Sequence, residues 1–311
     1  MRYYCGIDGG GTKTAVLLID EKGHELSSTQ TTGSSWIALG EKGVADLYEA
    51  EIDKCLKQAG RQRSELAGIA AGVPCFGENL QADATIKTLM RERFGEVPVY
   101  LCNDAEVGWA GSLGLKPGIN IVAGTGSIAY GQNSRGESVR CGGWSTHFGD
   151  EGSCYWLGRK AVELFAKEMD GRAEKGALYE IIMDEFKPER PEDFVNMAEI
   201  EYSHDRSRVA SLQKYLLMAA KAGDDSARSL YLAAADELGL MALAAARRIQ
   251  IPGEQLGVSV SGGILHAREF FFERFNEWIE RFGGYYKEAE MTPVQGAALL
   301  ARHKYGDRRR N

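Results

Sequence analysis

The chain lacks any long uninterrupted apolar run, and this absence excludes several classes of protein. No stretch of the 311 residues approaches the roughly 18 consecutive apolar residues of a membrane span. The opening residues, MRYYCGID, are too short and too polar for a signal peptide and lead directly into an expected strand. We therefore expect a cytoplasmic protein without a membrane partner.

Excess positive charge and paired cysteines are also missing. The net charge of −7 disfavours a protein that binds nucleic acid non-specifically. The six cysteines form no C-x-x-C pair and stand near no histidine at zinc-finger spacing. We interpret them as reduced thiols and expect neither a nucleic-acid partner nor a structural zinc ion.

No low-complexity segment or Ser/Pro-rich linker marks a boundary between domains, so the domain organisation is inferred from the order of the expected strands and helices. A chain of this length favours two domains. Strands are expected at 3–8, 14–20 and 24–31, and again at 119–123, 127–131 and 139–141. Each series begins with a glycine-rich hairpin and continues into alternating or helical segments, which predicts a duplicated α/β architecture.

The domain boundaries follow from the point at which the second series of strands begins. We predict an N-terminal domain over 1–116 and a C-terminal domain over 117–291. A largely helical stretch at about 155–250 is expected as an insertion in the second domain. The final helix, 292–304, carries small residues on one face and is expected to complete the first domain.

The first hairpin turn, GIDGGGTKT from Gly6 to Thr14, has the composition of a phosphate-binding loop. Glycines such as Gly10 and Gly11 let backbone N–H groups approach phosphate oxygens, and Thr12 and Lys13 would add a hydroxyl group and a positive charge. Asp8, at the end of the strand, suits a water-mediated contact with Mg²⁺, which keeps most of its waters.

Two other phosphate motifs do not fit this segment. A P-loop needs lysine directly after its last glycine and then a helix, but Thr12 displaces Lys13 and a strand pattern follows. A dinucleotide fingerprint needs a glycine where Thr14 stands. A plain hairpin turn is the remaining alternative, although three consecutive glycines exceed what a turn requires.

A second turn, Gly124-Thr125-Gly126-Ser127, has a similar composition. Alone it could equally be an ordinary turn. Together with the first hairpin in a duplicated architecture, it predicts two loops that clamp a triphosphate.

Two carboxylate-bearing segments complete the set of candidates. Asp104 follows an expected strand and begins a helix, so it could be an N-cap or could accept a proton from an attacking hydroxyl. The segment from Cys141 to Ser153 contains Trp144 and the adjacent acids Asp150 and Glu151. Carboxylates and aromatic walls are typical of sugar sites, although acids beside a helix N-terminus also occur in capping turns.

These residues occur in an order that resembles the sugar-kinase/actin/heat-shock-protein superfamily of ATPases. The phosphate loops correspond to 8–14 and 124–127, the adenosine motif to VSVSGG at 258–263, and the connecting helices to 105–113 and 293–301. The resemblance implies ATP and Mg²⁺ as cofactors, with Gly262 and Gly263 contacting the nucleotide. It also implies two duplicated actin-like, ribonuclease H-like domains that close over a central cleft.

The Gly-Gly-Trp…Gly-Asp-Glu-Gly-Ser pattern at 142–153 is similar to that of eukaryote-like N-acetylglucosamine kinases and their bacterial relatives, of the BadF/BadG/BcrA/BcrD ATPase type. This resemblance makes Asp104 the catalytic base. Departures from the pattern as seen in animal enzymes occur at Ser34, Ile128 and Ser145, the last of which replaces a glycine. The sugar-binding residues that the resemblance implies are Ser34, Trp36, Asp104, Ser127, Gly143, Trp144 and Asp150.

The function expected from this resemblance is the ATP-dependent phosphorylation of N-acetylglucosamine to its 6-phosphate, with glucosamine or N-acetylmuramic acid as alternative substrates. The partner is then a small sugar, and a homodimer is possible. From a different class, an ATPase activator of a 2-hydroxyacyl-CoA dehydratase would hold an iron–sulfur cluster, for which Cys141 and Cys154 are the available thiols. A non-catalytic ATP-binding regulator is the second rival.

Overall fold

A computed structural model describes residues 1–306 of the chain, which form two compact units. The first unit consists of Met1–Pro117 together with residues 288–306, and the second of Gly118–Lys287. Each unit contains a five-stranded sheet, and each has its own hydrophobic core.

The sheet of the first unit has the order β3-β2-β1-β4-β5. Its first three strands are antiparallel, whereas β1, β4 and β5 run parallel, with helices in the connections. The elements are β1 (Tyr3–Gly9), β2 (Lys13–Asp20), β3 (Glu25–Thr32), α1 (Trp36–Gln58), the 3₁₀ turn Arg63–Glu65, β4 (Leu66–Val73), α2 (Leu80–Phe94), β5 (Val99–Asn103), α3 (Asp104–Leu113) and α11 (Pro293–Tyr305).

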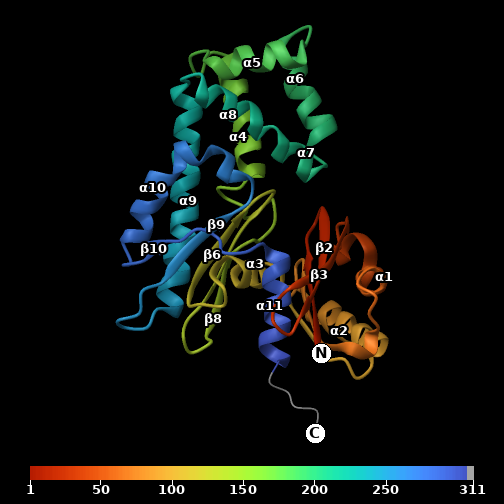
Figure 1. Ribbon diagram of the computed structural model, residues 1–311. Helices are drawn as coiled ribbons and strands as arrows, with labels where there is room; N and C mark the ends of the chain where they lie inside the picture. The colour runs from red at the N-terminus through yellow and green to blue at the C-terminus, as the bar shows by residue number, and fades with distance from the viewer. Residues whose placement is uncertain (307–311) are drawn as a thin grey trace. The chain divides into compact units, whose positions relative to one another are not determined.

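The second unit repeats this pairing pattern in its sheet, β8-β7-β6-β9-β10 (Figure 1). An antiparallel hairpin again precedes a parallel pair, so the duplicated α/β class expected from the sequence is confirmed. The elements are β6 (Gly118–Ala123), β7 (Ser127–Gln132), β8 (Ser138–Gly142), α4 (Cys154–Met169), α5 (Ala177–Phe186), α6 (Pro191–Met197), the π-helical turn Ala198–Tyr202, α7 (Arg206–Ser211), α8 (Gln213–Lys221), α9 (Asp225–Ile249), β9 (Gly257–Ser261), the 3₁₀ turn Gly263–Ala267, α10 (Arg268–Glu280) and β10 (Tyr285–Tyr286).

Helices occupy the second unit from Cys154 to Ile249, and α5 and α6 gather at one end, away from its strands (Figure 1). Over residues 1–306, α9 is the one helix long and apolar enough to pass a length-and-composition test for a membrane span. Half of the 18-residue window that passes the test is buried, and residues such as Leu238 and Ala242 belong to the core that α9 shares with the sheet, whereas Leu232 and Leu240 are exposed. A buried core helix passes the same test, so the feature is explained by packing.

Two close approaches explain the small-residue face of α11. A Cβ added at Gly296 would lie 2.2 Å from the backbone nitrogen of Gly111 in α3, and one at Gly6 of β1 would lie 2.1 Å from that of Ala298. Side chains at these positions would force the backbones apart. The absence of side-chain bulk therefore lets α11 pack directly on β1 and α3, which carry Asp8 and Asp104 respectively.

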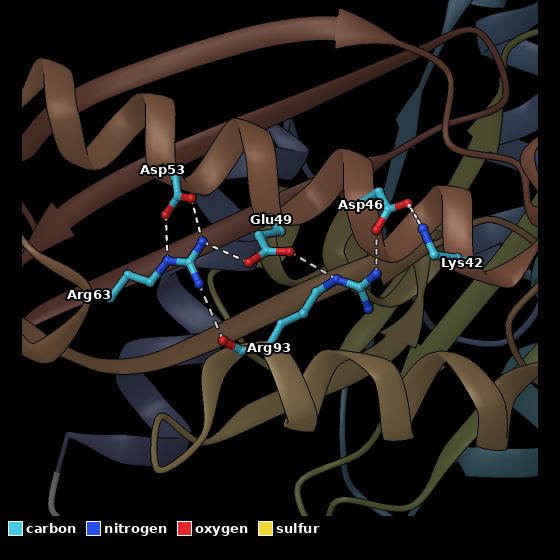
Figure 2. A network of polar contacts seen from close by, with 6 residues as sticks. All are labelled: Lys42, Asp46, Glu49, Asp53, Arg63 and Arg93. Atoms are coloured by element: carbon cyan, nitrogen blue, oxygen red, sulfur yellow. Dashed lines mark hydrogen bonds and ion pairs between the residues drawn. The ribbon is translucent and has the colours of Figure 1, made fainter.

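Helices α1 and α2 of the first unit are joined by a network of ion pairs (Figure 2). Glu49 accepts from Arg63 at 2.8 Å and from Arg93 at 2.9 Å, and Asp53 and Asp46 extend the network to either side. Lys42 joins Asp46 at 2.8 Å. The network begins after a kink at Gly40, so it fixes the body of α1 rather than its first turn.

Three local features have no simple counterpart in the sequence pattern. Helix α1 begins at Trp36 and passes through a kink at Gly40, which has φ +68°. Helix α10 is preceded by the 3₁₀ turn Gly263–Ala267. The two-residue strand β10 was not predicted, since so short an edge strand leaves no periodic pattern.

Candidate functional site

The carboxyl ends of three parallel strands bring two acids together in the first unit. Asp8 of β1 is paired in register with Gly72 of β4, which is paired with Cys102 of β5. Asp104 follows two residues after Cys102, and a Cβ at Gly72 would lie 3.0 Å from the Asp104 Cα. The Tyr48 hydroxyl group donates to the Gly72 carbonyl oxygen at 3.0 Å, so it lies at the strand between the two acids.

Asp104 is the first residue of α3, and the expectation that it might be the N-cap is wrong. The N-cap is Asn103, whose Oδ1 accepts from the Ala105 nitrogen at 3.0 Å while its Nδ2 donates to the Phe76 carbonyl oxygen. The capping requirement of the helix is therefore met by Asn103. Asp104 Oδ1 lies 3.1 Å from the same Ala105 nitrogen.

Asp8 is partly buried, and its environment changes its acidity. Burial raises the pKa of Asp8 to about 6, and the positive charge of Lys13 opposes the shift. Because burial disfavours the ionised carboxylate, a nearby positive charge would stabilise that form. The position therefore favours a metal ion or a further positive group beside Asp8.

The turn between β1 and β2 presents an open surface. The Gly10 nitrogen donates to the Lys13 carbonyl oxygen at 2.9 Å, and the Gly10 carbonyl oxygen accepts from the Ser34 nitrogen at 3.0 Å. Gly11, Thr12 and Lys13 are exposed, and the Cβ position of Gly11 meets no atom within 4 Å. The turn is thus held at its base while its tip is available to a ligand.

Ser34 and Trp36, predicted to face the sugar, come after β3, and the Ser34 nitrogen donates to Gly10 at the base of the β1–β2 turn. Ser34 is fully buried, and its Oγ lies 3.1 Å from the hydroxyl oxygen of Tyr48. Trp36 packs against the core of the first unit, and its buried indole N–H has no hydrogen-bond partner within residues 1–306. In this structure Ser34 therefore supports the loop, and Trp36 combines an apolar wall with an unused donor.

The second unit holds the other predicted phosphate loop. The Gly124 nitrogen donates to the Gly126 carbonyl oxygen at 2.9 Å, and the Gly124 carbonyl oxygen accepts from the Cys154 nitrogen at the start of α4. Gly262, with φ +106°, passes so close that its Cβ would lie 2.6 Å from the Gly124 nitrogen. The predicted phosphate and adenosine motifs of this unit are therefore direct neighbours.

Gly263 and the 3₁₀ turn that follows it lead into a surface pocket. A Cβ at Gly263 would meet the Cys154 sulfur at 2.8 Å, which explains the need for glycine there. The pocket has a volume of about 460 Å³, and its walls come from α8, α10 and the 3₁₀ turn. It is lined by Lys221, Leu265, His266, Arg268, Glu269, Phe272 and Glu273.

Asp150 lies behind the Gly124–Gly126 turn in a buried ion pair. Its Oδ1 accepts from the Ser127 backbone nitrogen at 3.0 Å, and its Oδ2 accepts from Arg206 Nη2 at 2.6 Å. The Asp150 side chain is 2% exposed, whereas that of Arg206 is 47% exposed. Ser127 in turn donates its hydroxyl to the Glu151 carbonyl oxygen at 2.6 Å.

The loop before Asp150 carries the other sugar candidates at the surface. Trp144 is 61% exposed, and the Arg140 guanidinium lies over its ring at 4.6 Å while donating to the Gly143 carbonyl oxygen. Ser145 has φ +83°, a backbone conformation that favours glycine. The replacement of a glycine by Ser145, noted in the sequence, therefore stands at a strained position.

The predicted residues thus form two clusters, one in each unit, and three neighbours were missed. Tyr48 lies on the apolar stripe of α1, and only its need to bond a buried hydroxyl could have drawn attention to it. Arg140 stands two residues before the Gly142-Gly143-Trp144 segment. Arg206 comes from a helical stretch without a recognisable motif, 56 residues beyond Asp150, so no local signal could have found it.

Comparisons with known proteins found relatives that match along most of the chain. The chain is 29% identical to an N-acetylmuramic acid/N-acetylglucosamine kinase from Clostridium acetobutylicum over 279 residues, covering 90% of each chain. It is 27% identical to an N-acetyl-D-glucosamine kinase from Dictyostelium discoideum, covering 96% of this chain and 97% of the relative.

A similar solved structure is that of a candidate N-acetylglucosamine kinase from Chromobacterium violaceum, with a TM-score of 0.74 and 25% identity over 96% of this chain and 99% of that one. The model of the BadF/BadG/BcrA/BcrD ATPase family matches residues 5–301. The resemblance stated from the sequence is confirmed, and the chain belongs to the BadF/BadG/BcrA/BcrD ATPase family.

Proposed function

We propose that this protein is an ATP-dependent kinase of an N-acetylated amino sugar, with N-acetylglucosamine phosphorylated on its 6-hydroxyl group. The observation that carries the proposal is the placement of Asp8 and Asp104 at the carboxyl ends of the parallel strands β1 and β5, on either side of β4, with the exposed Gly11–Lys13 turn following β1. A base, a metal-directing carboxylate and a phosphate loop are the parts that phosphoryl transfer requires. The kinase names of the similar proteins support the same reaction.

The role of each residue follows from its surroundings. Asp104 would accept the proton of the attacking sugar hydroxyl, because it is partly exposed and is not the helix cap. Gly10, Gly11, Thr12 and Lys13 would bind phosphate oxygens in the first unit, and Gly124, Thr125 and Gly126 in the second. Gly262 and Gly263 would contact the adenosine, for which the adjoining pocket offers space.

Ser127, Gly143, Trp144 and Asp150 are the proposed sugar contacts in the second unit, and Trp36 and Ser34 in the first. A primary hydroxyl group such as that on C6 is the least hindered nucleophile of a hexose. Each unit by itself offers one candidate wall for the acetyl group, which is Trp36 in the first unit, packed against the core, and the exposed Trp144 in the second.

Mg²⁺ fits the residues present. Within residues 1–306, no three His, Cys, Asp or Glu side chains gather as a ready-made metal site. The single partly buried carboxylate of Asp8 suits Mg²⁺, which keeps most of its waters and takes few protein carboxylates. Asp8 would hold the ion through water, and when bound the ion would neutralise charge on the phosphates.

Release of ADP in the presence of N-acetylglucosamine, with the product examined by phosphorus NMR, tests the proposal. We expect stoichiometric ADP and a phosphate resonance coupled to the protons on C6. ATP hydrolysis that is unaffected by any amino sugar would contradict it. A cytoplasmic location and a homodimer remain predictions.

A further inference from the structure

The ion pair between Asp150 and Arg206 is unusual because its two members differ so much in exposure. The carboxylate is almost completely buried, with one oxygen on the Ser127 nitrogen and the other on Arg206 Nη2. Nearly half of the arginine side chain reaches solvent. Arginine carries five N–H donors in a planar fork, and no other hydrogen bond or ion pair involves this side chain within residues 1–306.

The backbone around Arg206 fixes where its guanidinium lies. Arg206 is the first residue of α7, and the N-cap Asp205 accepts from the nitrogens of Ser207 and Arg208. Helix α7 packs closely against α4, as a Cβ added at Gly158 of α4 would lie only 2.0 Å from the Val209 carbonyl oxygen of α7. Helix α4 begins four residues after Asp150, so the contact between the helices brings the arginine to the carboxylate.

Arg206 covers one side of the Gly124–Gly126 turn and leaves the other open. A Cβ at Gly126 would lie 1.9 Å from Arg206 Nη2 and 2.6 Å from Asp150 Oδ1, whereas one at Gly124 would meet nothing within 4 Å. A phosphate can therefore approach the turn at Gly124. The guanidinium stands on the Asp150 side, where the sugar is proposed to bind.

We infer that Arg206 is a specificity-determining residue that binds a carboxylate substituent on the amino sugar, and the inference rests on the proposed function. The unused N–H groups of the guanidinium would donate to the substituent while Nη2 stays on Asp150. The paired Asp150 keeps the guanidinium in place and is itself neutralised, so a second carboxylate can approach without facing an unscreened negative charge. N-acetylmuramic acid, which is N-acetylglucosamine with a lactyl ether on O3, carries such a group.

The test compares kcat/KM for N-acetylmuramic acid and N-acetylglucosamine in wild-type protein, Arg206→Ala and Arg206→Lys. The matched control is Arg208→Ala. Arg208 lies two residues further along α7, is 46% exposed and pairs with Glu201 instead. The ratio of the two kcat/KM values cancels any general loss of folding or activity.

We expect wild-type protein to phosphorylate both sugars. Arg206→Ala should lower the ratio of N-acetylmuramic acid to N-acetylglucosamine by about 10–100-fold, because a charge-assisted hydrogen bond to the carboxylate is lost. Arg206→Lys should give a ratio between those of Arg206→Ala and wild-type protein, because lysine keeps the positive charge but lacks the planar guanidinium group. Arg208→Ala should leave the ratio unchanged.

Three results would overturn the inference. The first is wild-type protein that accepts N-acetylglucosamine but not N-acetylmuramic acid, and the second is an unchanged ratio in Arg206→Ala. The third is a parallel loss with both sugars and a higher KM for ATP, which would assign Arg206 to the phosphates. Wild-type protein that releases no ADP with either sugar would instead refute the proposed function itself.

Discussion

Ser34 Oγ lies 3.1 Å from the hydroxyl oxygen of Tyr48, and that hydroxyl group donates to the Gly72 carbonyl oxygen at 3.0 Å. The chain of contacts joins the end of β3, helix α1 and the strand between the two acids. Burial raises the pKa of Tyr48 well above its usual range, so the phenol stays protonated and can act as the donor. The Ser34 backbone nitrogen also donates to the Gly10 carbonyl oxygen, which links these hydrogen bonds to the predicted phosphate-binding turn.

Replacing Tyr48 by Phe should therefore destabilise the first unit. The change leaves Ser34 Oγ and the Gly72 carbonyl oxygen without this partner in a buried place, which costs about 1–3 kcal/mol in the free energy of unfolding. Urea unfolding measures the difference, with Tyr285→Phe, at a 48% exposed residue, as the control. Equal stability of the two variants would show that the Tyr48 hydroxyl group is not a structural link.

Asp104→Asn should reduce kcat by about 10²–10⁴-fold, because the amide cannot accept the proton of the attacking hydroxyl group. The KM for ATP should change little. Glu106→Gln is the matched control, since Glu106 lies in the same first helical turn but accepts from the Tyr100 hydroxyl group at 2.8 Å. Near wild-type turnover in Asp104→Asn would remove this residue from the proposed chemistry.

Activity should vanish in EDTA and return with Mg²⁺. Asp8→Asn should raise the Mg²⁺ concentration needed for half-maximal rate by about 10–100-fold, as is typical when a carboxylate that orients a metal ion through water is lost. The control is Asp225→Asn, at a side chain that is 95% exposed. An Mg²⁺ titration that is identical in Asp8→Asn and wild-type protein contradicts the assignment.

Glu168 of α4 predicts a pH dependence of stability that is independent of the site. Burial raises the pKa of Glu168 to about 7, the hydrogen bond from the Gly176 nitrogen opposes the shift, and the charge of Asp224 adds to it. Because the folded pKa exceeds the unfolded one, the folded state binds the proton more tightly. The resulting stability is present below about pH 4.5 and is lost as pH rises through about 7.

Glu168→Gln should remove this dependence and make the protein more stable than wild type at pH 8, by about 1–3 kcal/mol. Thermal unfolding between pH 5 and 8 measures the effect. Glu163→Gln, on the same helix, is the control and should keep the fall of stability between pH 5 and 8. Hydrogen bonds from Lys160 and Lys167 lower the pKa of Glu163 to about 2, so this group does not titrate in that range. A wild-type stability that does not fall over this range would refute the assignment.

The fold could be predicted from the sequence where local patterns are strong. The two glycine hairpins and the alternation after them indicated a duplicated α/β chain, and the repeated strand order bears this out. Asp104 was placed correctly at the start of a helix, but its capping role was left open. Asn103 and Asp104 are both good caps, and only the backbone geometry decides between them.

The candidate site was less predictable where contacts are distant in sequence. Asp150 was selected from its segment, yet its partner Arg206 depends on how α7 packs on α4, which no periodicity encodes. Similarly, the resemblance implied that Ser34 binds sugar, and no local pattern indicated that its hydroxyl group is buried against Tyr48. Such long-range pairs follow from tertiary packing rather than from composition or spacing.

The most direct test of the central claim is the ratio of kcat/KM for N-acetylglucosamine to the values for glucosamine and glucose. It is measured by coupled ADP release with Mg-ATP. If the acetyl group is bound by apolar walls, its loss should lower kcat/KM by about 10–200-fold. A preference for glucosamine or glucose over N-acetylglucosamine would contradict the account.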